Sequence, residues 1–376
     1  MRISRTLSLY VMRESLFYCG LAFFVLTLVL LTQNLLRRLD ELFLIGLTAQ
    51  DLRVVLECIL PMAISYSIPL AFLVGVLLSV RRFGADGELT GLGSAGIGPL
   101  SFLIPYLVLG LLATCVSAWL LTSVEHESRR NLVRLFKTAA ARGAILEPGK
   151  FREIGKRVVF VEDRDREGQL TGVMILDQSQ DDRPFRIFAD RGQFQFSEST
   201  AQIELELRNG ELHFAPIAGK PTRYERIHFD KFSYQLDVGH ILGGEFGPVR
   251  PKQMNLADLR HVLTRAKAGD PLLELDQRDP LEYELEIHRR RTLPFAPLLF
   301  AGVAVPIALA SENRGRSIGL LLVLSVAFGY YALAAAMETM AQQAWLGAGL
   351  ASWIPNLVFA TAGLSLALYA RRRLPA

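Results

Sequence analysis

The sequence predicts a polytopic membrane protein with six transmembrane α-helices, three before and three after an inserted all-β domain of jelly-roll type. Two observations lead to this fold class. Both ends of the 376-residue chain are strongly apolar, whereas the stretch from Ser123 to Arg291 is polar. Within that stretch apolar and polar residues alternate, which is the period of β-strands. We therefore divide the chain into residues 1–122, 123–291 and 292–376, and expect a water-soluble middle domain on one side of the bilayer.

Six apolar runs match the roughly 20 residues that a helix needs to cross the hydrocarbon core of a bilayer. The first run is too long for the apolar core of a signal peptide, and no small-residue cleavage site follows it, so we expect it to remain as a helix. The runs are Ser15–Leu36, Cys58–Val80, Leu100–Thr122, Thr292–Ser311, Ser317–Met337 and Trp353–Ala370.

The arginines of the short loops predict the orientation, because cytoplasmic loops carry an excess of basic residues. Both termini are expected in the cytoplasm, and the β domain on the opposite side. Two basic groups conflict with this rule, Arg37–Arg38 and Arg289–Arg291. The arginines that agree with it are Arg2, Arg5, Arg13, Arg81, Arg82, Arg314, Arg316, Arg371, Arg372 and Arg373.

Short alternating segments in the polar stretch predict the strands of a sandwich or jelly roll. Asn209-Gly210 directly follows one of them and is typical of a two-residue hairpin turn, so we expect the chain to reverse there. Surface helices are expected on either side of the strands, over Ser123–Arg142 and Leu256–Ala268. The predicted strands are Arg157–Val161, Gly172–Leu176, Phe185–Ala189, Gln193–Phe196, Gln202–Leu207, Glu211–Phe214, Arg226–Phe229 and Phe232–Leu236.

Motifs that resemble enzyme sites carry little weight. Residues 91–96 match G-x-G-x-x-G, but they lie between two predicted membrane helices, without the strand and the later acidic residue of a dinucleotide site. The chain has no G-x-x-x-x-G-K-[ST] motif, so it should not hydrolyse ATP by itself. Residues 125–127 (Glu-His-Glu) fit a solvated helix face better than a metal site. We predict no catalytic residue, metal, cofactor or nucleic-acid partner.

The loop from Arg81 to Gly98 is the first candidate functional segment. It contains Arg82, Asp86 and Glu88, followed by small residues. A short helix with a few exposed charges could lie along the membrane there and press against a soluble partner. On composition alone, a flexible loop is an equally good interpretation.

The end of the first predicted helix is the second candidate. Gln33 and Arg37, like Asn34 and Arg38, are one helical turn apart and form a polar patch at head-group height. Arginine binds phosphate through a planar fork of donors, so the patch suits an anionic head group. Snorkelling to the interface, or pairing with the acidic residues at 40 and 41, is the alternative interpretation.

The order of these parts resembles the LptF/LptG permeases of lipopolysaccharide export over nearly the whole chain. The loop Phe83–Thr90, followed by Ala95-Gly96, is similar to the coupling loop of that family, although Gly87 stands where the family usually has serine. Leu31–Arg38 and residues 305–316 look more like LptF than LptG.

The resemblance implies a non-catalytic permease subunit of an ABC transporter in the inner membrane of a Gram-negative cell, with its β domain in the periplasm. It implies a heterodimer with an LptG-like permease, a cytoplasmic LptB-like ATPase dimer, a single-span LptC-like protein and a periplasmic LptA-like bridge. Lipopolysaccharide is the implied cargo. Glu88, with Asp86 and Arg82 around it, becomes the ATPase-coupling acid, and Arg37, with Arg38, Gln33 and Asn34, the contact to lipid phosphates. Asn34 is neutral where the family has a basic residue.

Two other functions remain open from the sequence. One is a membrane-anchored periplasmic scaffold without transport, which would need one or two anchors rather than six helices. The other is an ABC exporter subunit for another lipid or a lipoprotein. Such permeases usually carry their external domain after the first helix, whereas here it follows the third.

Overall fold

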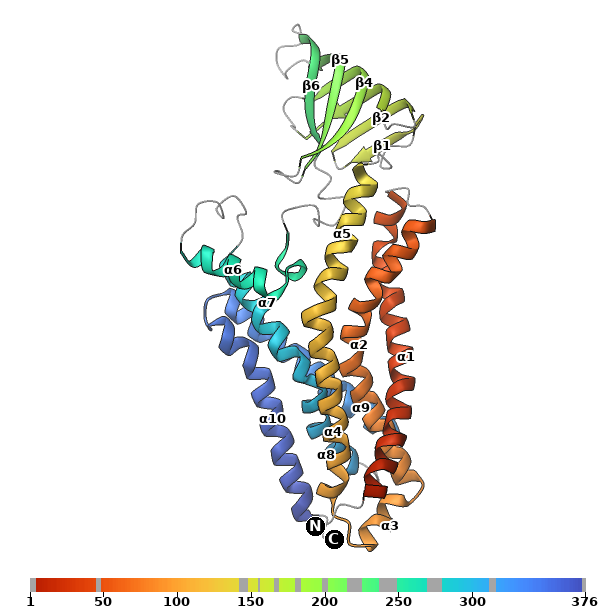
Figure 1. Ribbon diagram of the computed structural model, residues 1–376, viewed down its shortest axis with the longest axis vertical. Helices are drawn as coiled ribbons and strands as arrows, with labels where there is room; N and C mark the ends of the chain where they lie inside the picture. Colours follow the sequence, from red (N-terminus) through yellow and green to blue (C-terminus); the bar gives the residue numbers. More distant parts are fainter. Residues whose placement is uncertain are drawn as a thin grey trace. The chain divides into compact units, whose positions relative to one another are not determined.

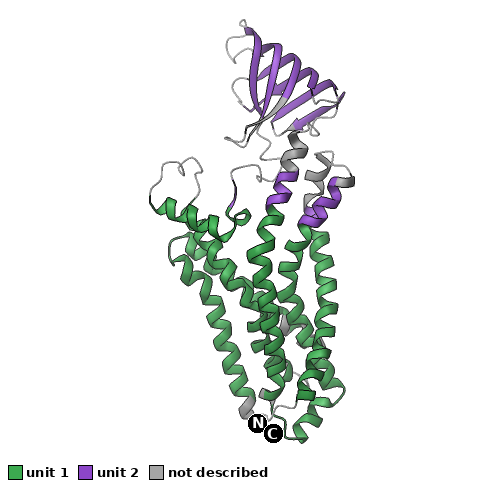
Figure 2. Ribbon diagram, viewed as in Figure 1, with its two compact units in different colours: residues 1–34, 59–129, 251–376 green, residues 35–58, 130–250 purple. Residues whose placement is uncertain are grey.

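The computed structural model describes residues 5–44, 49–141, 148–154, 156–165, 169–179, 184–197, 202–214, 225–236, 249–268, 279–310 and 316–373. The chain divides into two compact units (Figure 2). Unit 1 comprises residues 1–34, 59–129 and 251–376, and unit 2 comprises residues 35–58 and 130–250. Residues 251–291, which the sequence analysis placed with the inserted domain, therefore group with the helices.

Helices make up the described part of unit 1, and the ends of three of them extend into unit 2 (Figure 1). The first turns of α1, the short helix α3 and the end of α10 lie at the same end of the bundle. The helices are α1 (Arg5–Leu44), α2 (Ala49–Ala85), α3 (Glu88–Ser94), α4 (Pro99–Trp119), α5 (Glu125–Ala141), α6 (Leu256–Lys267), α7 (Pro280–Thr292), α8 (Ala296–Ala310), α9 (Arg316–Gln342) and α10 (Ala348–Arg373).

Among the described residues, five helical stretches are long and apolar enough to cross a membrane. They coincide with five of the six predicted runs. The helix α9 contains the remaining run, Ser317–Met337, which has no charged side chain. The five stretches are Arg5–Arg37, Asp51–Ala85, Ser101–Leu135, Pro280–Ala310 and Ala348–Ala370.

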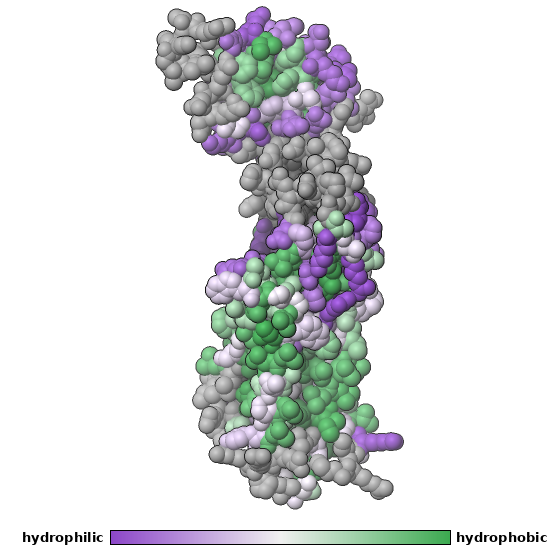
Figure 3. Space-filling model, turned by 90° about the vertical axis from the view of Figure 1, so that its left-hand side faces the viewer, coloured by the Kyte–Doolittle hydropathy of each residue, from purple (hydrophilic) through white to green (hydrophobic). Residues whose placement is uncertain are grey.

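The core of unit 1 is one apolar cluster to which α1, α2, α4, α8, α9 and α10 all contribute. Tyr106 and Phe300 are its largest fully buried side chains on α4 and α8. On the outside, apolar side chains cover much of the helical unit on the face drawn in Figure 3, whereas hydrophilic ones predominate on the rim of the sheet in unit 2. An apolar exterior suits a lipid environment.

The helix predicted after the third apolar run is present, but the prediction that it is a surface helix is wrong at its start. A π-helical turn, Leu120–Val124, joins α4 to α5, so the two form one continuous run. Glu125, His126 and Ser128 are buried in the first turns of α5. Polar residue type suggested exposure, but none of these three side chains is more than 9% exposed.

The described strands of unit 2 form one antiparallel sheet of six strands in sequential order, each paired with the next along the chain. This order is a meander, so the predicted jelly-roll topology is not confirmed. The sheet is curved, as one contact shows. Tyr234 of β6 donates a hydrogen bond to Asp177 of β3, three strands away in the sheet order. The strands are β1 (Phe151–Ile154), β2 (Arg157–Arg164), β3 (Gln169–Asp177), β4 (Phe185–Ser197), β5 (Gln202–Phe214) and β6 (Glu225–Leu236).

The hairpin predicted at Asn209-Gly210 is wrong. Both residues lie inside β5, which pairs with β4 and β6 on either side of them. Asn209 adopts a left-handed conformation (φ 52°), and a Cβ on Gly210 would overlap the carbonyl oxygen of Phe188 and the ring of Phe229. The dipeptide therefore lies within a continuous strand instead of reversing it.

Candidate functional site

Two clusters of charged and hydrogen-bonding side chains stand out in unit 1, and both include residues of α2. Their members on α2, Tyr66 and Arg82, are about 24 Å apart along the axis of a helix that rises 1.5 Å per residue. The Arg82 cluster consists of Tyr10, Glu14, Arg82, Asp86 and Glu88. The Glu286 cluster consists of Tyr66, Glu286, Arg289 and Arg290, with the carbonyl groups of residues 251, 252 and 254.

The chain geometry between α2 and α3 builds the Arg82 cluster. The helix α2 ends at Ala85, and Gly87 takes a left-handed conformation (φ 72°) that glycine adopts without steric cost. Asp86 still donates its backbone N–H to the carbonyl of Arg82 at 3.0 Å. This tight turn places Glu88, the first residue of α3, back beside the last turn of α2.

Arg82 contacts acidic side chains on α1, on α3 and in the turn between α2 and α3. Its Nη1 lies 2.9 Å from Oε1 of Glu14 on α1, and its Nε lies 3.1 Å from Oδ2 of Asp86. Its Nη2 lies 3.8 Å from Oε1 of Glu88 on α3, the longest of the three ion pairs. Tyr10 donates its hydroxyl to the same Glu88 oxygen at 3.0 Å.

The Arg82 cluster has more negative than positive charge. Three carboxylates, those of Glu14, Asp86 and Glu88, share one guanidinium. The side chain of Glu88 is 31% exposed, and of the three carboxylates it lies farthest from the guanidinium of Arg82. An additional cation from outside the chain would therefore be attracted to this cluster, and Glu88 is the carboxylate that could bind it with the least disruption.

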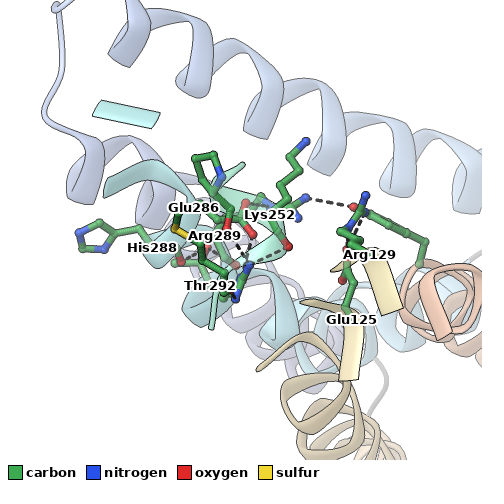
Figure 4. Close-up of polar contacts among 11 residues, drawn as sticks. Glu125, Arg129, Lys252, Glu286, His288, Arg289 and Thr292 are labelled. Carbon is green, nitrogen blue, oxygen red and sulfur yellow. Dashed lines mark hydrogen bonds and ion pairs between the residues drawn. The ribbon is translucent and has the colours of Figure 1, made fainter. Parts of the chain in front are cut away.

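The Glu286 cluster is buried, and one carboxylate serves two arginines (Figure 4). Oε2 of Glu286 accepts from Nε of Arg289 at 3.0 Å, and Oε1 accepts from Nε of Arg290 at 2.8 Å. Arg289 also donates to the hydroxyl of Tyr66 at 3.1 Å, which links α7 to α2. The same view shows a second ion pair, between Glu125 and Arg129 on α5.

Arg290 holds the segment that follows the sheet in the sequence. This segment, from Pro251 to Met254, begins the last part of unit 1. Arg290 donates to the carbonyl of Met254 at 2.6 Å, of Lys252 at 3.1 Å and of Pro251 at 3.2 Å. These carbonyls belong to a 3₁₀ turn, Pro251–Gln253, and the residue that follows it. A charged donor stabilises carbonyls at a helix end, although the carbonyl of Pro251 also accepts from the N–H of Met254 at 3.2 Å.

These contacts explain why two basic residues, Arg289 and Arg290, occur where the predicted orientation places them outside the cytoplasm, although an excess of basic residues is typical of cytoplasmic loops. Arg289 and Arg290 are paired with Glu286, and Arg290 is buried, so neither is a free loop charge. The neighbouring Arg291 is exposed. The basic tripeptide is thus mainly structural in this fold.

The residues predicted to bind the head group of a lipid lie on α1. Gln33 and Arg37 are exposed. The side chain of Asn34 donates to the carbonyl of Leu30 at 2.8 Å, so one of its amide hydrogens is used within the helix. The side chain of Arg38 is outside the described part of the structure.

A third polar network lies in the sheet of unit 2 around the buried Asp177. It accepts hydrogen bonds from Ser179 and Tyr234, and Arg157 lies 3.1 Å away. Burial alone would raise the pKa of this carboxyl, but these donors outweigh burial and hold the pKa below its usual range. Burial and the bond to Asp177 raise the pKa of the Tyr234 phenol. This network is a satisfied core element rather than a binding site.

Sequence reasoning missed Tyr10, Glu14, Tyr66 and Glu286. Glu286 carried a signal, because it precedes Arg289 and Arg290 by three and four residues, the spacing of ion pairs on one helix face. Glu14 stands at the edge of a charge-free run, where an ionisable residue points to a specific partner. No group of three or more metal-binding side chains occurs among the residues that the structure describes.

Comparison with known proteins points to one family. The sequence profile described as "Lipopolysaccharide export system permease LptF/LptG" matches residues 9–369. The chain is 22% identical, over 375 residues, to the lipopolysaccharide export system permease protein LptF of Escherichia coli K12, with 96% of this chain and 94% of that protein covered. The same values hold for the protein of that name from Shigella flexneri.

Proposed function

Because the chain belongs to the LptF/LptG family of lipopolysaccharide export permeases, we propose that it is one permease subunit of an ABC transporter that extracts lipopolysaccharide from the inner membrane. It is a transport subunit and not itself an enzyme. In this proposal α9 is the sixth membrane span. The common end of α1, α3 and α10 faces the cytoplasm, and the sheet lies in the periplasm.

The proposal includes four kinds of protein partner. A related LptG-like permease completes the translocation path, and an LptB-like ATPase dimer supplies the energy from the cytoplasm. An LptC-like single-span protein and an LptA-like bridge receive the lipid in the periplasm. Exposed apolar side chains on α1 and α9, such as Phe24 and Phe328, are available to lipid or to a partner helix. A scaffold without transport would not require so many candidate spans.

The single observation that carries the coupling role is the position of Glu88. It begins a seven-residue helix between two long apolar helices, in a cluster with three carboxylates and one arginine. Such a cluster attracts a basic side chain from a docking ATPase. Asp86 and Arg82 then shape the site around Glu88.

The test is co-purification of the full chain with its ATPase. We expect Glu88→Lys to abolish co-purification and Glu88→Ala to weaken it, because the first adds repulsion where the second only removes attraction. Glu57→Ala is the matched control, since Glu57 is an exposed glutamate near the other end of α2, paired only weakly with Arg53. Normal co-purification of both Glu88 variants, with normal lipid release, would refute the assignment.

The second element of the proposal is that Arg37 contacts the phosphates of lipid A, with Gln33, Asn34 and Arg38 contributing less. Arg37 is exposed and its fork of donors suits a phosphate, whereas Asn34 is partly engaged with its own helix. We expect Arg37→Glu to lower the yield of lipopolysaccharide crosslinked to a photoreactive residue at Leu36. Arg13→Glu, near the other end of α1, is the control. An unchanged yield would count against the phosphate contact.

A further inference from the structure

We propose that Arg82 is a positioning residue that transmits movement of α3 to α1, through its ion pair with Glu14. The inference rests on the proposed docking of an ATPase at α3 and extends it to the internal connection that would follow. Arg82 contacts Glu14 on α1 at 2.9 Å and Glu88 on α3 at 3.8 Å with different nitrogens of one planar group. A displacement of Glu88 therefore changes the electrostatic balance at Glu14.

The backbone at Arg82 is held in place by the packing of the next side chain. The next residue, Phe83, is buried and packs edge-to-face on Phe102 of α4, with ring centroids 5.5 Å apart. Phe83 also contacts the ring of Tyr10 on α1 at 5.7 Å. Because the arginine extends from a fixed backbone, a change in its contacts moves its partners more readily than its own helix.

The helix α3 is joined to α2 by a very short connection. Only Asp86 and Gly87 separate the two helices, and Gly87 donates its N–H to the carbonyl of Gly84 at 3.0 Å. A force on α3 is thus delivered directly to Asp86 and to the last turn of α2, where Arg82 lies.

The helix α1 is able to respond, because much of its surface is not packed within the chain. Leu16, Phe17 and Phe24 are each more than 60% exposed. Further along, α1 crosses α2 closely at Gly75, where a Cβ would overlap the backbone of Cys19. The part of α1 before Cys19 can therefore rotate about this crossing point. That part includes Tyr10 and Glu14, which belong to the Arg82 cluster.

Tyr10 strengthens the connection. Its hydroxyl donates to Glu88 at 3.0 Å and accepts from Arg82 at 3.4 Å, so α1 contacts α3 directly as well as through α2. When an external cation binds Glu88, it competes with Tyr10 and Arg82 for the same carboxylate. Arg82 then pairs more fully with Glu14 and Asp86.

The test follows α3 and α1 separately in the complete complex, purified with its ATPase and reconstituted with rough lipopolysaccharide. After replacement of the three native cysteines, one spin-label pair joins Thr90 to Leu368 and reports on α3. A second pair joins Leu9 to Leu368 and reports on α1. In the unsubstituted protein we expect both distances to shift when a non-hydrolysable ATP analogue binds.

In Arg82→Gln we expect the α3 shift to persist and most of the α1 shift to be lost, because only the direct contact of Tyr10 with Glu88 then joins α1 to α3. Glu14→Gln, which removes only the α1 partner, should give the same result and serves if Arg82→Gln folds poorly. We expect lipid released per ATP hydrolysed to fall at least about fivefold, the lower range of coupling between linked sites. Arg13→Gln, an equal change of charge at the exposed neighbour of Glu14, should leave both shifts intact.

An unchanged α1 shift in both Arg82→Gln and Glu14→Gln would overturn the relay while leaving the docking proposal in place. If the α3 pair does not move in the unsubstituted protein, docking on α3 and the relay both fall. The two proposals can thus fail separately.

Discussion

The Arg82 cluster and the Glu286 cluster use the same chemistry in different surroundings. Each joins arginine to carboxylate where several chain segments meet. In the Glu286 cluster the side chains of Glu286 and Arg290 are only 5% and 3% exposed. In the Arg82 cluster the exposed fractions run from 25% for Glu14 to 48% for Asp86. Burial makes an ion pair expensive to break, whereas partial exposure leaves it adjustable.

The number of hydrogen bonds shows the same contrast. Arg290 donates to three backbone carbonyls as well as to Glu286, all within 3.2 Å. Arg82 holds Glu88 at 3.8 Å, which is beyond hydrogen-bond distance. We infer that the first cluster is an anchor that stays in place during transport. The second is suited to exchanging partners.

The largest effect is expected from Glu286→Gln, because it leaves two arginines without their counter-charge. Removing one member of a buried ion pair costs about 3–5 kcal/mol. Thermal unfolding of the detergent-solubilised chain should show a large drop in midpoint. Glu284→Gln, on the same helix and paired with Lys267 at 3.4 Å nearer the surface, should shift it little. Equal shifts for both variants would show that the Glu286 cluster is not an anchor.

A smaller effect is expected from Arg290→Lys, which keeps the charge but not the planar fork. The ammonium group can pair with Glu286 but cannot also reach three carbonyls, so about 1.5–3 kcal/mol should be lost. Hydrogen exchange should increase at the start of α6, whose cap, Asn255, directly follows the anchored turn. Arg291→Lys is the matched control. Unchanged exchange at α6 would mean that the carbonyl bonds do not fix this segment.

Sequence reasoning predicted the five candidate membrane spans of the described residues, because a membrane span is a local property of about 20 residues. It predicted the sheet less well. Apolar residues occupy odd-numbered positions before Asn209 (Leu205, Leu207) and even-numbered ones after it (Leu212, Phe214), although β5 keeps one register with β4 throughout. That break in phase resembles the end of a strand. The pairing that keeps the strand continuous is invisible in one sequence.

The Arg82 cluster was only partly predictable for the same reason. Arg82, Asp86 and Glu88 are neighbours in the chain, so the loop could be selected from composition. Tyr10 precedes Glu88 by 78 positions, and only the packing of α1 on α2 brings them together. The Glu286 cluster was different, since its central ion pairs are local and their spacing could have been recognised.

The Asp177 network in the sheet is intermediate between the Arg82 cluster and the Glu286 cluster. The stabilisation that it gives the folded chain should depend on pH. The folded-state pKa of Asp177 lies below the value of about 3.9 expected for the unfolded chain. The stabilisation is therefore complete above that pH and is lost as the pH falls through the folded pKa.

We expect Asp177→Asn to cost about 1–2 kcal/mol at neutral pH, because it weakens hydrogen bonds to a charged acceptor. The ratio of hydrogen-exchange rates between variant and unsubstituted protein, taken in β3 at the same pH, should approach one as the pH falls below 4. Asp163→Asn, an exposed carboxylate on β2, is the control. A ratio that does not change with pH would contradict the shifted pKa.

The smallest effect on stability is expected from Arg82→Gln, and this separates adjustable contacts from fixed ones. Partly exposed ion pairs contribute little to stability and are weakened by salt. The unfolding midpoint of Arg82→Gln should therefore stay close to that of the unsubstituted chain, and the small difference should shrink at high ionic strength. A loss as large as that of Glu286→Gln would show that Arg82 is an anchor too. Its role in moving α1 would then have no physical basis, because a contact that costs several kcal/mol to break cannot exchange partners in each transport cycle.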